Sequence, residues 1–225
     1  MKIYGHPWSI NTRKTLAVFA EKNRDVTLSL VMIPKGEHKH PDHLRVHPFG
    51  KVPVLDDNGF VLYETRAINA YVDAVLDGPS LVPSNARDRA RMDQWINVAD
   101  SYFIPFAHPL IVEVLFRRFL GGVRDEAVVA AGRAGIVPAL DTIDCALAKS
   151  PFLAGDAYSL ADIHWSPYLE YMMAIGEGGP IDARANVRAW WARISARAAW
   201  KKAARTGPQP YDEGVTAGVI ETLYR

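Results

Sequence analysis

Four short runs of apolar and β-branched residues in the first third of the chain predict β-strands. Apolar residues recur at helical spacing after the first run and again after the fourth. A short helix that cannot pass Pro48 separates the second run from the third. The turn sequence Asp56-Asp-Asn-Gly59 predicts a hairpin between the last two strands. The predicted strands are residues 2–4, 26–33, 52–55 and 60–63.

This order of elements, βαβαββα, predicts a four-stranded mixed sheet with helices on its faces, which is a thioredoxin-like arrangement. Residues 78–85 have the glycine, proline and serine content of a linker. Beyond the linker every periodic segment is helical. We therefore predict a small α/β domain over residues 1–77 and an all-helical domain over residues 86–225. The expected helices of the second domain are about 86–119, bent at Pro105 and Pro109, then 126–149, 159–174 and two short helices within 183–204.

Two features of the second domain are expected to be structural. Ser159-Leu-Ala-Asp162 is a capping box that begins a helix. Five tryptophans at helical positions are expected in the core. They are Trp95, Trp165, Trp190, Trp191 and Trp200.

The C-terminal end predicts a connector and a last short helix. Residues 206–214 hold two prolines and two glycines, which do not sustain a helix. Residues 215–225 carry one apolar face, and so short a helix must dock on something. It either lies toward the cleft where a substrate binds or is a frayed or merely packed tail.

Charge and composition exclude several classes of function. Lys and Arg total 26 against 25 Asp and Glu, so no overall field attracts nucleic acid or an anionic membrane. The single cysteine, Cys145, excludes an internal disulfide, and its position on an apolar helix predicts a buried side chain. The chain begins with a strand rather than a signal sequence, and no apolar run approaches the length of a membrane span. We therefore expect a soluble, cytoplasmic protein.

The first candidate for chemistry is the segment 5–14, which joins the first strand to the first helix. Ser9 or Asn11 can cap this helix, whose free N–H groups and positive dipole end attract anions. A hydroxyl at Ser9 would meet a bound anion, phosphate or thiolate, although a purely structural cap is the simpler interpretation of this segment alone. Arg13, one turn further on, would add positive charge or pair with an acid on the surface.

A cluster of histidines is a weaker candidate, for a metal site. A metal site needs a convergent set of ligands with fixed geometry, and histidines in a loop beside lysines are usually solvated. We therefore expect no metal. The histidines are His38, His40, His43 and His47.

Three further short motifs are placed along the chain: one after the second predicted strand, one leading into the third and one after the fourth. Together with Ser9, in this order and spacing, they resemble the glutathione S-transferase family, in particular its serine-type members and most closely the phi class. Phe152-Leu-Ala-Gly-Asp-Ala-Tyr-Ser-Leu-Ala-Asp162 resembles the second-domain signature of that family, so the resemblance covers nearly the whole chain. The three motifs are Gly36-Glu-His-Lys39, His47-Pro-Phe-Gly-Lys-Val-Pro53 and Tyr63-Glu-Thr-Arg-Ala-Ile68.

The resemblance implies the glutathione transferase fold, with a glutathione site in the first domain. It places Ser9 at the hydroxyl that faces the glutathione sulfur. It places Glu64 and Thr65 at the pair that holds the γ-glutamyl end, with the ligand carboxylate at a helix N-terminus. It also implies a cis peptide bond between Val52 and Pro53, which turns the backbone of Val52 toward the cysteinyl unit.

His38 and Lys39 match residues near the glycine carboxylate of glutathione. Lys51 stands where the family frequently has glutamine, so its side-chain contact with the ligand is open. Thr65 stands where serine is common and keeps the hydroxyl. His47 replaces a usual asparagine, and we assign it no function.

The function implied by the resemblance is glutathione transfer: the protein stabilises the glutathione thiolate and adds it to a hydrophobic electrophilic small molecule, with glutathione as co-substrate. The resemblance also implies a homodimer in which Phe49 inserts between helices of the partner, with burial of Phe49 within its own subunit as the alternative. Two alternatives stay open. Glutathione-dependent peroxidase or disulfide chemistry normally employs a cysteine where Ser9 stands, and a binding or scaffold protein of the same fold would have lost catalysis.

Overall fold

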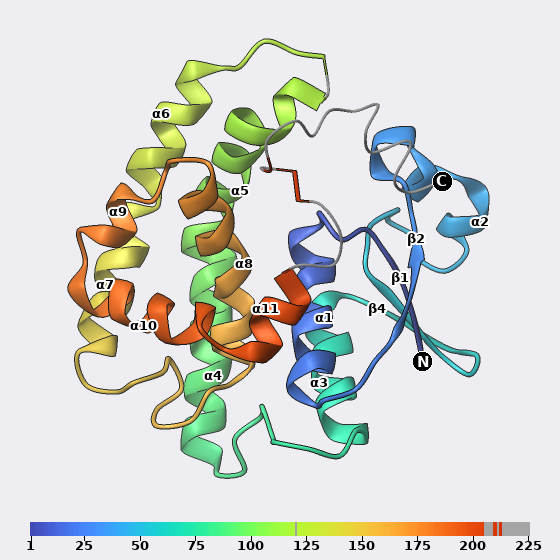
Figure 1. Ribbon diagram of the computed structural model, residues 1–225, viewed down its shortest axis with the longest axis horizontal. Coiled ribbons are helices and arrows are strands. Elements are labelled where there is room, and N and C mark those ends of the chain that lie inside the picture. Colours follow the sequence, from blue (N-terminus) through green and yellow to red (C-terminus); the bar gives the residue numbers. More distant parts are fainter. Residues whose placement is uncertain (120, 205–208, 211, 213–225) are drawn as a thin grey trace. The chain divides into compact units, whose positions relative to one another are not determined.

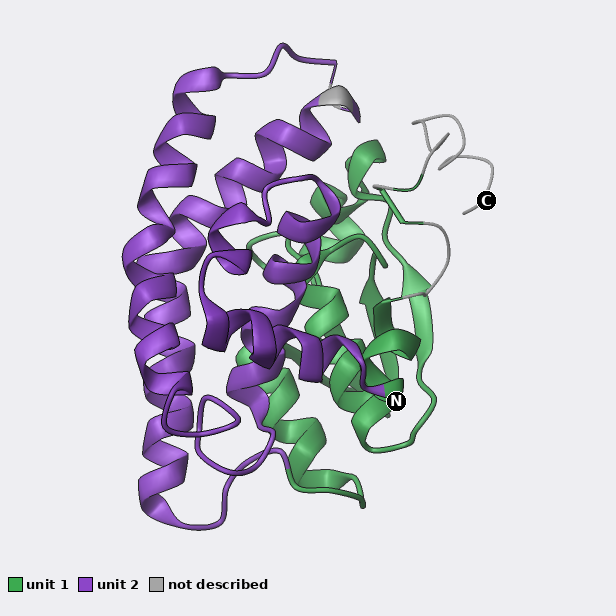
Figure 2. Cartoon of the chain, turned by 60° about the vertical axis from the view of Figure 1, so that its left-hand side comes forward, with its two compact units in different colours: residues 1–80, 198–225 green, residues 81–197 purple. Residues whose placement is uncertain are grey.

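The computed structural model describes residues 1–119, 121–204, 209, 210 and 212. Two compact units divide the chain (Figure 2): unit 1 comprises residues 1–80 and the chain from residue 198 on, and unit 2 comprises residues 81–197. The division falls within the predicted linker. The units differ from the predicted domains at the C-terminal end, because helix α11 (Ala198–Ala204) packs on α1 (Ile10–Glu21) of unit 1.

The predicted C-terminal connector is described at three residues. Gln209, Pro210 and Asp212 lie in a turn rather than a helix. The backbone N–H of Gln209 donates to the Asp212 carboxylate at 2.7 Å, and the N–H of Asp212 donates back to the Gln209 carbonyl at 3.1 Å. The last helix predicted for residues 215–225 lies outside the described residues.

The sheet of unit 1 has the strand order β2-β1-β3-β4 (Figure 1). Strand β1 pairs in parallel with β2 and antiparallel with β3, and β3 forms an antiparallel hairpin with β4. The prediction of a four-stranded mixed sheet in thioredoxin-like order is therefore confirmed. The strands are β1 (Lys2–Gly5), β2 (Thr27–Leu30), β3 (Val54–Asp57) and β4 (Phe60–Tyr63).

The second strand is shorter than predicted. It ends at Leu30, and two 3-10 turns follow, η1 (Ile33–Lys35) and η2 (Glu37–Lys39). The Glu37 carboxylate accepts a hydrogen bond from the N–H of Met32 at 2.7 Å, which draws the chain out of the sheet. The apolar character of residues 26–33 predicted a continuous strand and did not indicate this turn.

The hairpin turn is tighter than the sequence indicated. Strand β3 continues through Asp57, and Asn58 and Gly59 alone form the turn, with φ of 53° and 94°. Two successive residues with positive φ match the right-handed twist of a two-residue hairpin. The Asp56 carboxylate accepts from the N–H of Gly59 at 2.8 Å and fixes the turn.

Helices cover both faces of this sheet. Helix α1 and helix α3 (Thr65–Val75) lie side by side on one face, and the short helix α2 (Pro41–Leu44) lies on the other (Figure 1). The core between them is apolar, as the predicted periodicity requires. Its fully buried side chains include Ile3, Val18, Leu55, Ile68 and Val72.

Unit 2 is helical, as predicted. The long helix expected at its start runs without a break from Ala86 to Phe116. Two π-helical segments interrupt its α-helical pattern, one just before Pro105 and one after Pro109, because a proline supplies no N–H to the ladder. The segments are α4 (Ala86–Val98), η3 (Ala99–Phe103), α5 (Ile104–Ile111), η4 (Val112–Phe116) and a 3-10 turn, η5 (Arg117–Phe119).

The remaining helices of unit 2 follow the predicted segments with one difference. The single helix expected over residues 126–149 is two helices, because the chain turns at Ile136 just ahead of Pro138. They are α6 (Glu126–Gly135) and α7 (Val137–Leu147), and α8 (Leu160–Ala174), α9 (Gly179–Asp182) and α10 (Ala185–Ser195) complete the unit.

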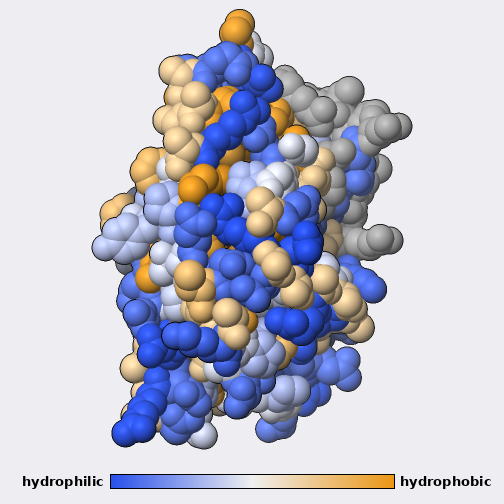
Figure 3. Space-filling model, turned by 90° about the vertical axis from the view of Figure 1, so that its left-hand side faces the viewer, coloured by the Kyte–Doolittle hydropathy of each residue, from blue (hydrophilic) through white to orange (hydrophobic). Residues whose placement is uncertain are grey.

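One expectation about membrane spans is wrong. The helix from Ala86 to Phe116 is long and apolar enough to meet the length and composition of a span. A core helix meets the same criterion. Phe103, Leu110 and Ile111 of this helix are fully buried, and α5 packs on α6 and α8 within unit 2. The face of the molecule drawn in Figure 3 is mostly hydrophilic, with apolar side chains in small separate groups.

The predicted capping box is present at the start of α8. The Ser159 hydroxyl accepts from the backbone N–H of Ala161, and the Asp162 carboxylate accepts from the N–H of Ser159 at 2.9 Å. Asp162 is fully buried, which raises the pKa of its carboxyl, while hydrogen bonds from Leu153, Trp190 and Ser159 act in the opposite direction. The box is therefore part of the core as well as a helix cap.

The packing of Cys145 was predicted wrongly, whereas the prediction of core tryptophans is confirmed for four of the five. Cys145 is exposed. It lies on α7, whose buried residues Leu140, Ile143 and Leu147 form a stripe that does not include it. Four of the five tryptophans are buried, and Trp191 is half-buried.

Candidate active site

The strand register brings the four sequence motifs to one end of the sheet. Gly5 at the end of β1 pairs with Leu30 at the end of β2. Val54 at the start of β3 pairs with Tyr4 on one side and with Tyr63, at the end of β4, on the other. The segments that follow β1, β2 and β4 and the segment that precedes β3 therefore all leave the sheet at the same end. These segments contain the predicted site residues Ser9, His38, Lys39, Lys51, Val52, Pro53, Glu64 and Thr65.

Ser9 is the N-cap of α1. Its backbone is extended, with φ −73° and ψ 120°, and its hydroxyl oxygen accepts from the N–H of Thr12 at 3.3 Å. No residue that the structure describes accepts a hydrogen bond from the Ser9 O–H. The helix cap uses only the acceptor side of this hydroxyl, so its proton stays available for a ligand. Asn11, the alternative cap, is exposed and does not cap the helix.

Gly5 allows the strand and the helix to approach closely. A Cβ atom at this position would lie 2.7 Å from the Cγ2 and from the Oγ1 of Thr12. Contacts that short do not occur between real side chains, so a larger residue would push α1 away from the end of β1. The position of Ser9 relative to the sheet depends on this glycine.

The environment of the Arg13 side chain differs from the surface ion pair that we considered. Its side chain is fully buried, and Nη2 donates to the Pro7 carbonyl at 3.4 Å and to the side-chain oxygen of Gln209. The guanidinium therefore ties the turn before Ser9 to the described part of the C-terminal connector. Its positive charge lies one helical turn from the Ser9 cap.

His6 is a buried titratable group that sequence reasoning missed. Its Nδ1 accepts a hydrogen bond from the N–H of Trp8 at 3.2 Å, and its ring packs edge-on against the Trp8 ring. Burial lowers the pKa of His6 from its ordinary value of 6.5 to about 4. The ring is therefore neutral near pH 7.

The stability of the protein should fall in mild acid because of His6. The unfolded chain binds a proton at His6 below pH 6.5, whereas the folded chain binds it only near pH 4. The contribution of this group to the free energy of unfolding is therefore complete above pH 6.5 and is lost as the pH falls below that value. The free energy of unfolding should drop by up to about 1.4 kcal/mol per pH unit in that window. Urea unfolding at a series of pH values measures this slope. His6→Asn should flatten it and His40→Asn, at an exposed histidine, should not; an equal slope in both variants would contradict the assignment.

The turn at residues 36–39 packs on the loop that leads into β3. Lys39 Nζ donates to the carbonyl of Phe49 at 3.0 Å. Gly50 has φ 57°, and a Cβ there would lie 2.7 Å from the carbonyl oxygen of His38. These contacts require glycine at position 50 and hold His38 and Lys39 against the loop.

The same loop is fixed from α2 and carries the predicted cis bond. His43 Nε2 lies 2.7 Å from the carbonyl oxygen of Lys51, so the ring donates from that nitrogen. The peptide bond between Val52 and Pro53 is cis, as the family resemblance predicted. Burial, followed by the charges of Lys39, His43 and Lys51, lowers the pKa of His38. The site is electropositive on this side.

Glu64 is held in an unusual backbone conformation. It has φ 71° and ψ 114°, outside the regions that a side chain-bearing residue prefers. Such a conformation costs about 1–3 kcal/mol and is concentrated at functional sites. Glu64 immediately precedes α3, and its side chain does not cap that helix. The N-terminus of α3, which begins at Thr65, is the kind of position that attracts a carboxylate.

An aromatic cluster around His47 was not foreseen. The His47 ring lies 4.9 Å from that of Tyr63 and 6.3 Å from those of His43 and Phe49. His47 is almost fully buried, and burial is the main cause of its lowered pKa. Phe49 remains 65% exposed at the rim of the cluster. A buried histidine supporting a loop is not visible from the sequence, which showed only four neighbouring histidines.

A metal centre finds no support in these residues. Among the described residues, no group of three or more His, Cys, Asp or Glu side chains is arranged to hold a metal ion. The expectation that no metal takes part stays a prediction.

Comparison with known proteins decides the family. Residues 1–74 match the family model of the glutathione S-transferase N-terminal domain, and residues 103–198 match that of the C-terminal domain. The chain belongs to the glutathione S-transferase family. It is 36% identical to "Glutathione S-transferase 3" of Zea mays over 93% of this chain and 96% of the relative, and 33% identical to "Glutathione S-transferase F10" of Arabidopsis thaliana over 87% and 93%.

Solved structures agree with this assignment. Glutathione transferase F7 from Populus trichocarpa superposes with a TM-score of 0.85 at 33% identity, over 90% of this chain and 97% of that one. A maize glutathione S-transferase I, solved in complex with an atrazine glutathione conjugate, superposes with a TM-score of 0.83 at 31% identity, over 90% and 95%. These relatives are plant phi-class enzymes, and the glutathione transferase fold and the phi-class resemblance predicted from sequence are confirmed.

Proposed function

We propose that this glutathione S-transferase conjugates glutathione to hydrophobic electrophilic small molecules, with Ser9 stabilising the glutathione thiolate. The observation that supports the role of Ser9 is that the helix cap uses only the oxygen of its hydroxyl and not the proton. The oxygen caps α1 by accepting from Thr12, while the proton has no acceptor among the described residues. An anionic sulfur at this position would receive that hydrogen bond and would lie at the positive end of α1.

The other predicted site residues are proposed to hold the rest of the tripeptide. Glu64 and Thr65 bind the γ-glutamyl end, whose carboxylate meets the N-terminus of α3, which the Glu64 side chain does not cap. The backbone of Val52, ahead of Pro53, pairs with the cysteinyl unit. The glycine carboxylate lies near three residues of this loop region, a placement supported by the hydrogen bond from Lys39 Nζ to the Phe49 carbonyl, which holds that ammonium group beside the loop. These residues are His38, Lys39 and Lys51.

Two measurements test the proposal. Isothermal titration should show one glutathione site per chain, and ultraviolet difference spectroscopy should show thiolate absorbance from bound glutathione near pH 7. A screen of electrophiles then identifies the second substrate. Binding without a thiolate signal or turnover would favour the non-catalytic scaffold, and reduction of a peroxide without conjugation would favour peroxidase chemistry. Absence of binding would contradict the proposal.

We further propose a homodimer in which Phe49 inserts into the partner. Support comes from the 65% exposure of this large apolar side chain at the tip of a loop that Lys39 and His43 hold in place. Light scattering at micromolar concentration should give about twice the 25.0 kDa chain mass. Phe49→Ser should shift the mass toward one chain on dilution, whereas Val123→Ser, at a side chain 93% exposed, should not. A monomer mass for the unmodified protein would contradict the dimer.

A cytoplasmic location and a part in detoxification complete the proposal. The cytosol holds the glutathione pool that the reaction consumes. The exposed Cys145 also favours a reducing compartment, because nothing in the chain can pair with it. The domain boundaries at residues 77 and 86 stay predictions.

A further inference from the structure

The buried contact between Arg13 and Gln209 joins two segments of unit 1 that are 196 positions apart in the chain. Arg13 is fully buried and Gln209 is 5% exposed, and the side-chain oxygen of Gln209 accepts from Nη2 of Arg13. Neither residue is among the proposed ligands of glutathione. A buried guanidinium needs acceptors for its N–H groups, because a charged group is costly to bury without hydrogen bonds. Gln209 supplies one of these acceptors.

Arg13 holds the turn that carries Ser9 from both sides. Its side chain donates to the carbonyl of Pro7 at 3.4 Å, and its backbone N–H donates to the carbonyl of Ser9 at 2.9 Å. The N–H of Ser9 in turn donates to the carbonyl of His6 at 2.9 Å. A different direction of the Arg13 side chain would release the Pro7 carbonyl. The turn that sets the direction of the Ser9 O–H would then be less well held.

The charge of Arg13 lies at the start of α1, where an anion is also favoured by the helix dipole. Gln209 is neutral, so it accepts from the guanidinium without adding a negative charge. A carboxylate in the same place would accept as well but would oppose the attraction of the guanidinium for an anion. Within residues 5–14 and the described part of the connector, the other titratable side chains are His6, Lys14 and Asp212. The ring of His6 is neutral near pH 7 and the other two have opposite charges, so the sign of the local charge follows Arg13.

The backbone of Gln209 is fixed by its own turn. Its N–H donates to the Asp212 carboxylate at 2.7 Å, and the N–H of Asp212 donates to the Gln209 carbonyl at 3.1 Å. Pro210 stands at the second position of this four-residue turn, where its restricted φ is favourable. Earlier in the chain, α11 packs on α1 (Figure 1), and Lys202 forms an ion pair with Asp25 at 2.6 Å. These contacts fix the direction in which Gln209 presents its side chain.

We propose that Gln209 is a positioning residue for the activation of glutathione. Its side chain orients Arg13, and Arg13 in turn holds the turn ahead of Ser9 and keeps a positive charge near the thiolate. Gln209 acts through Arg13 and not by contact with glutathione. This inference rests on the proposed role of Ser9. It gives the C-terminal part of the chain a function toward the first substrate.

Gln209→Glu separates this role from a purely structural one, because glutamate keeps the acceptor for Arg13 and adds a negative charge. The pKa of the bound glutathione thiol, measured by a pH titration of thiolate absorbance, should rise by about half a unit or more. Turnover near pH 7 should fall about threefold for each half unit. A purely structural contact predicts no change in either, since a charged acceptor holds Arg13 at least as firmly. Urea unfolding should show that the variant keeps its stability.

Gln209→Met tests the orientation of Arg13 directly, because methionine has a similar length but no oxygen acceptor. In a ¹⁵N-correlated NMR spectrum, the Nε–H signal of Arg13 is identified by its loss in Arg13→Lys. This signal should shift in Gln209→Met even without glutathione, and an unshifted signal would contradict the inference. In the Arg13→Lys background, Gln209→Met should change the thiol pKa less than it does in the unmodified protein, because the two residues act as a unit.

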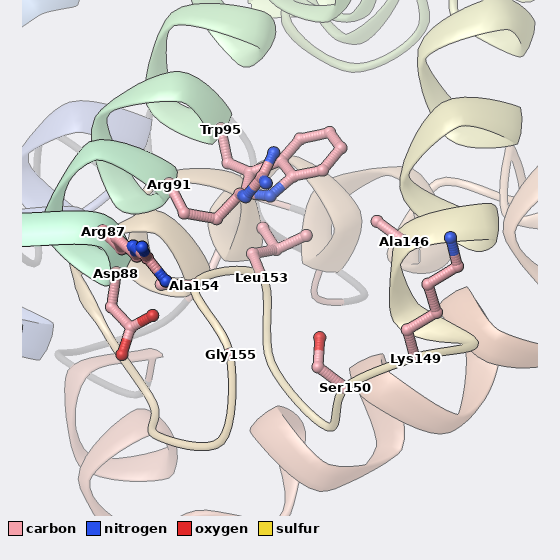
Figure 4. Close-up of a pocket in the computed structure, with 10 residues that line it drawn as sticks. All are labelled: Arg87, Asp88, Arg91, Trp95, Ala146, Lys149, Ser150, Leu153, Ala154 and Gly155. Carbon is pink, nitrogen blue, oxygen red and sulfur yellow. The ribbon is translucent and has the colours of Figure 1, made fainter.

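Unit 2 offers a matched control. Arg91 lines a cavity beside α4 (Figure 4) and donates from Nη1 to the side-chain oxygen of Gln94 at 2.6 Å, but both side chains are exposed. Gln94→Glu makes the same chemical change at an arginine–glutamine pair and should leave the thiol pKa unchanged.

The inference is overturned if Gln209→Glu shifts the thiol pKa no more than Gln94→Glu does. When the unmodified protein gives the thiolate signal, that result refutes the role of Gln209 and leaves the proposed function intact. Absence of the thiolate signal in the unmodified protein would refute the proposed role of Ser9 and this inference together. The two failures are therefore distinguished by the unmodified protein alone.

Discussion

Replacing Ser9 with alanine should raise the pKa of bound glutathione thiol by about one unit or more and lower turnover near pH 7 about tenfold for each unit. Affinity for glutathione should change little, because the rest of the tripeptide is proposed to be held by other residues. A pH titration of thiolate absorbance gives the pKa, and the pH dependence of kcat/KM gives the rate effect. Both should shift together if thiolate is the reacting form.

The magnitude follows from the energy that thiolate formation needs. A free thiol with a pKa of about 8.5 is only a few per cent ionised at pH 7, and making it mostly thiolate needs a shift of about two units, or about 2.7 kcal/mol. A serine hydroxyl is too weak a base to remove the proton, but it can donate to the thiolate. A hydrogen bond to a charged acceptor contributes about 1.5–3 kcal/mol, and a helix N-terminus about 0.3–1 kcal/mol more. These two contributions suffice without a general base.

The structure allows the donor role of Ser9 to be separated from its role as a cap. Alanine removes both the donor and the acceptor for the N–H of Thr12, and loss of the cap alone costs about 1 kcal/mol of stability. Ser9→Asp keeps a capping oxygen but places a negative charge beside the sulfur, so it should retain stability and lose activity. Ser9→Thr keeps both functions. Unchanged thiol pKa and rate in Ser9→Ala would leave Ser9 as a cap only, and Asn11 would become the next candidate donor.

Local sequence signals predicted the elements that depend on local chemistry. The hairpin, the four strands and the capping box of α8 each rest on residues within a few positions of one another. The helical run from Ala86 to Phe116 was also predicted as one long helix that continues through its two prolines. Two local features were nevertheless missed: the hydrogen bond from Met32 to Glu37 beyond the end of β2, and the turn at Ile136 ahead of Pro138.

Other errors arose where distant residues decide the outcome. Cys145 was expected in the core because its helix is apolar, but the buried stripe of α7 is set by which side faces its neighbours. Arg13 was expected either to add positive charge to the site or to pair with an acid on the surface, yet Gln209, 196 positions away, accepts its hydrogen bond in the interior. The packing of α11 on α1 likewise joins segments from opposite ends of the chain. None of these contacts has a signal in the local pattern.

The candidate site also combines features that the sequence predicted with features that depend on the rest of the fold. Its residues were named from motifs, and strand register accounts for their convergence at one end of the sheet. Its supporting features were not foreseen. The positive φ of Glu64 and the burial of His47 against Tyr63 are imposed by the surrounding fold, because no isolated segment favours either. Motifs identify the groups that touch a ligand more readily than the groups that hold them.

The largest effect on stability is expected at Asp162, the acid of the capping box. Its carboxylate accepts from the N–H of Leu153 at 3.0 Å, from Nε1 of Trp190 at 2.8 Å, and from the backbone and hydroxyl of Ser159 at 2.9 and 3.0 Å. The carboxylate thus joins α8, α10 and the loop before α8 at one buried point. A substitution here affects three segments of unit 2 at once.

Asp162→Ala should lower the free energy of unfolding by about 4 kcal/mol or more, because each buried donor left without an acceptor costs about 1–3 kcal/mol. Ser159→Ala should cost only about 1 kcal/mol, the typical value for loss of a helix cap. Asp162→Asn should fall between them, since the amide keeps one acceptor but turns an N–H₂ group toward donors. Chemical unfolding in urea measures all three.

Asp156→Ala is the matched control, because Asp156 lies in the same loop and is exposed. It should change the free energy of unfolding by less than about 0.5 kcal/mol. If Asp162→Ala were no more destabilising than this control, the hydrogen bonds at Asp162 would not be stabilising unit 2. A large loss in Asp162→Ala together with a small one in Ser159→Ala would instead show that the acid matters mainly as the buried acceptor that fixes Leu153 and Trp190, and only secondarily as a helix cap.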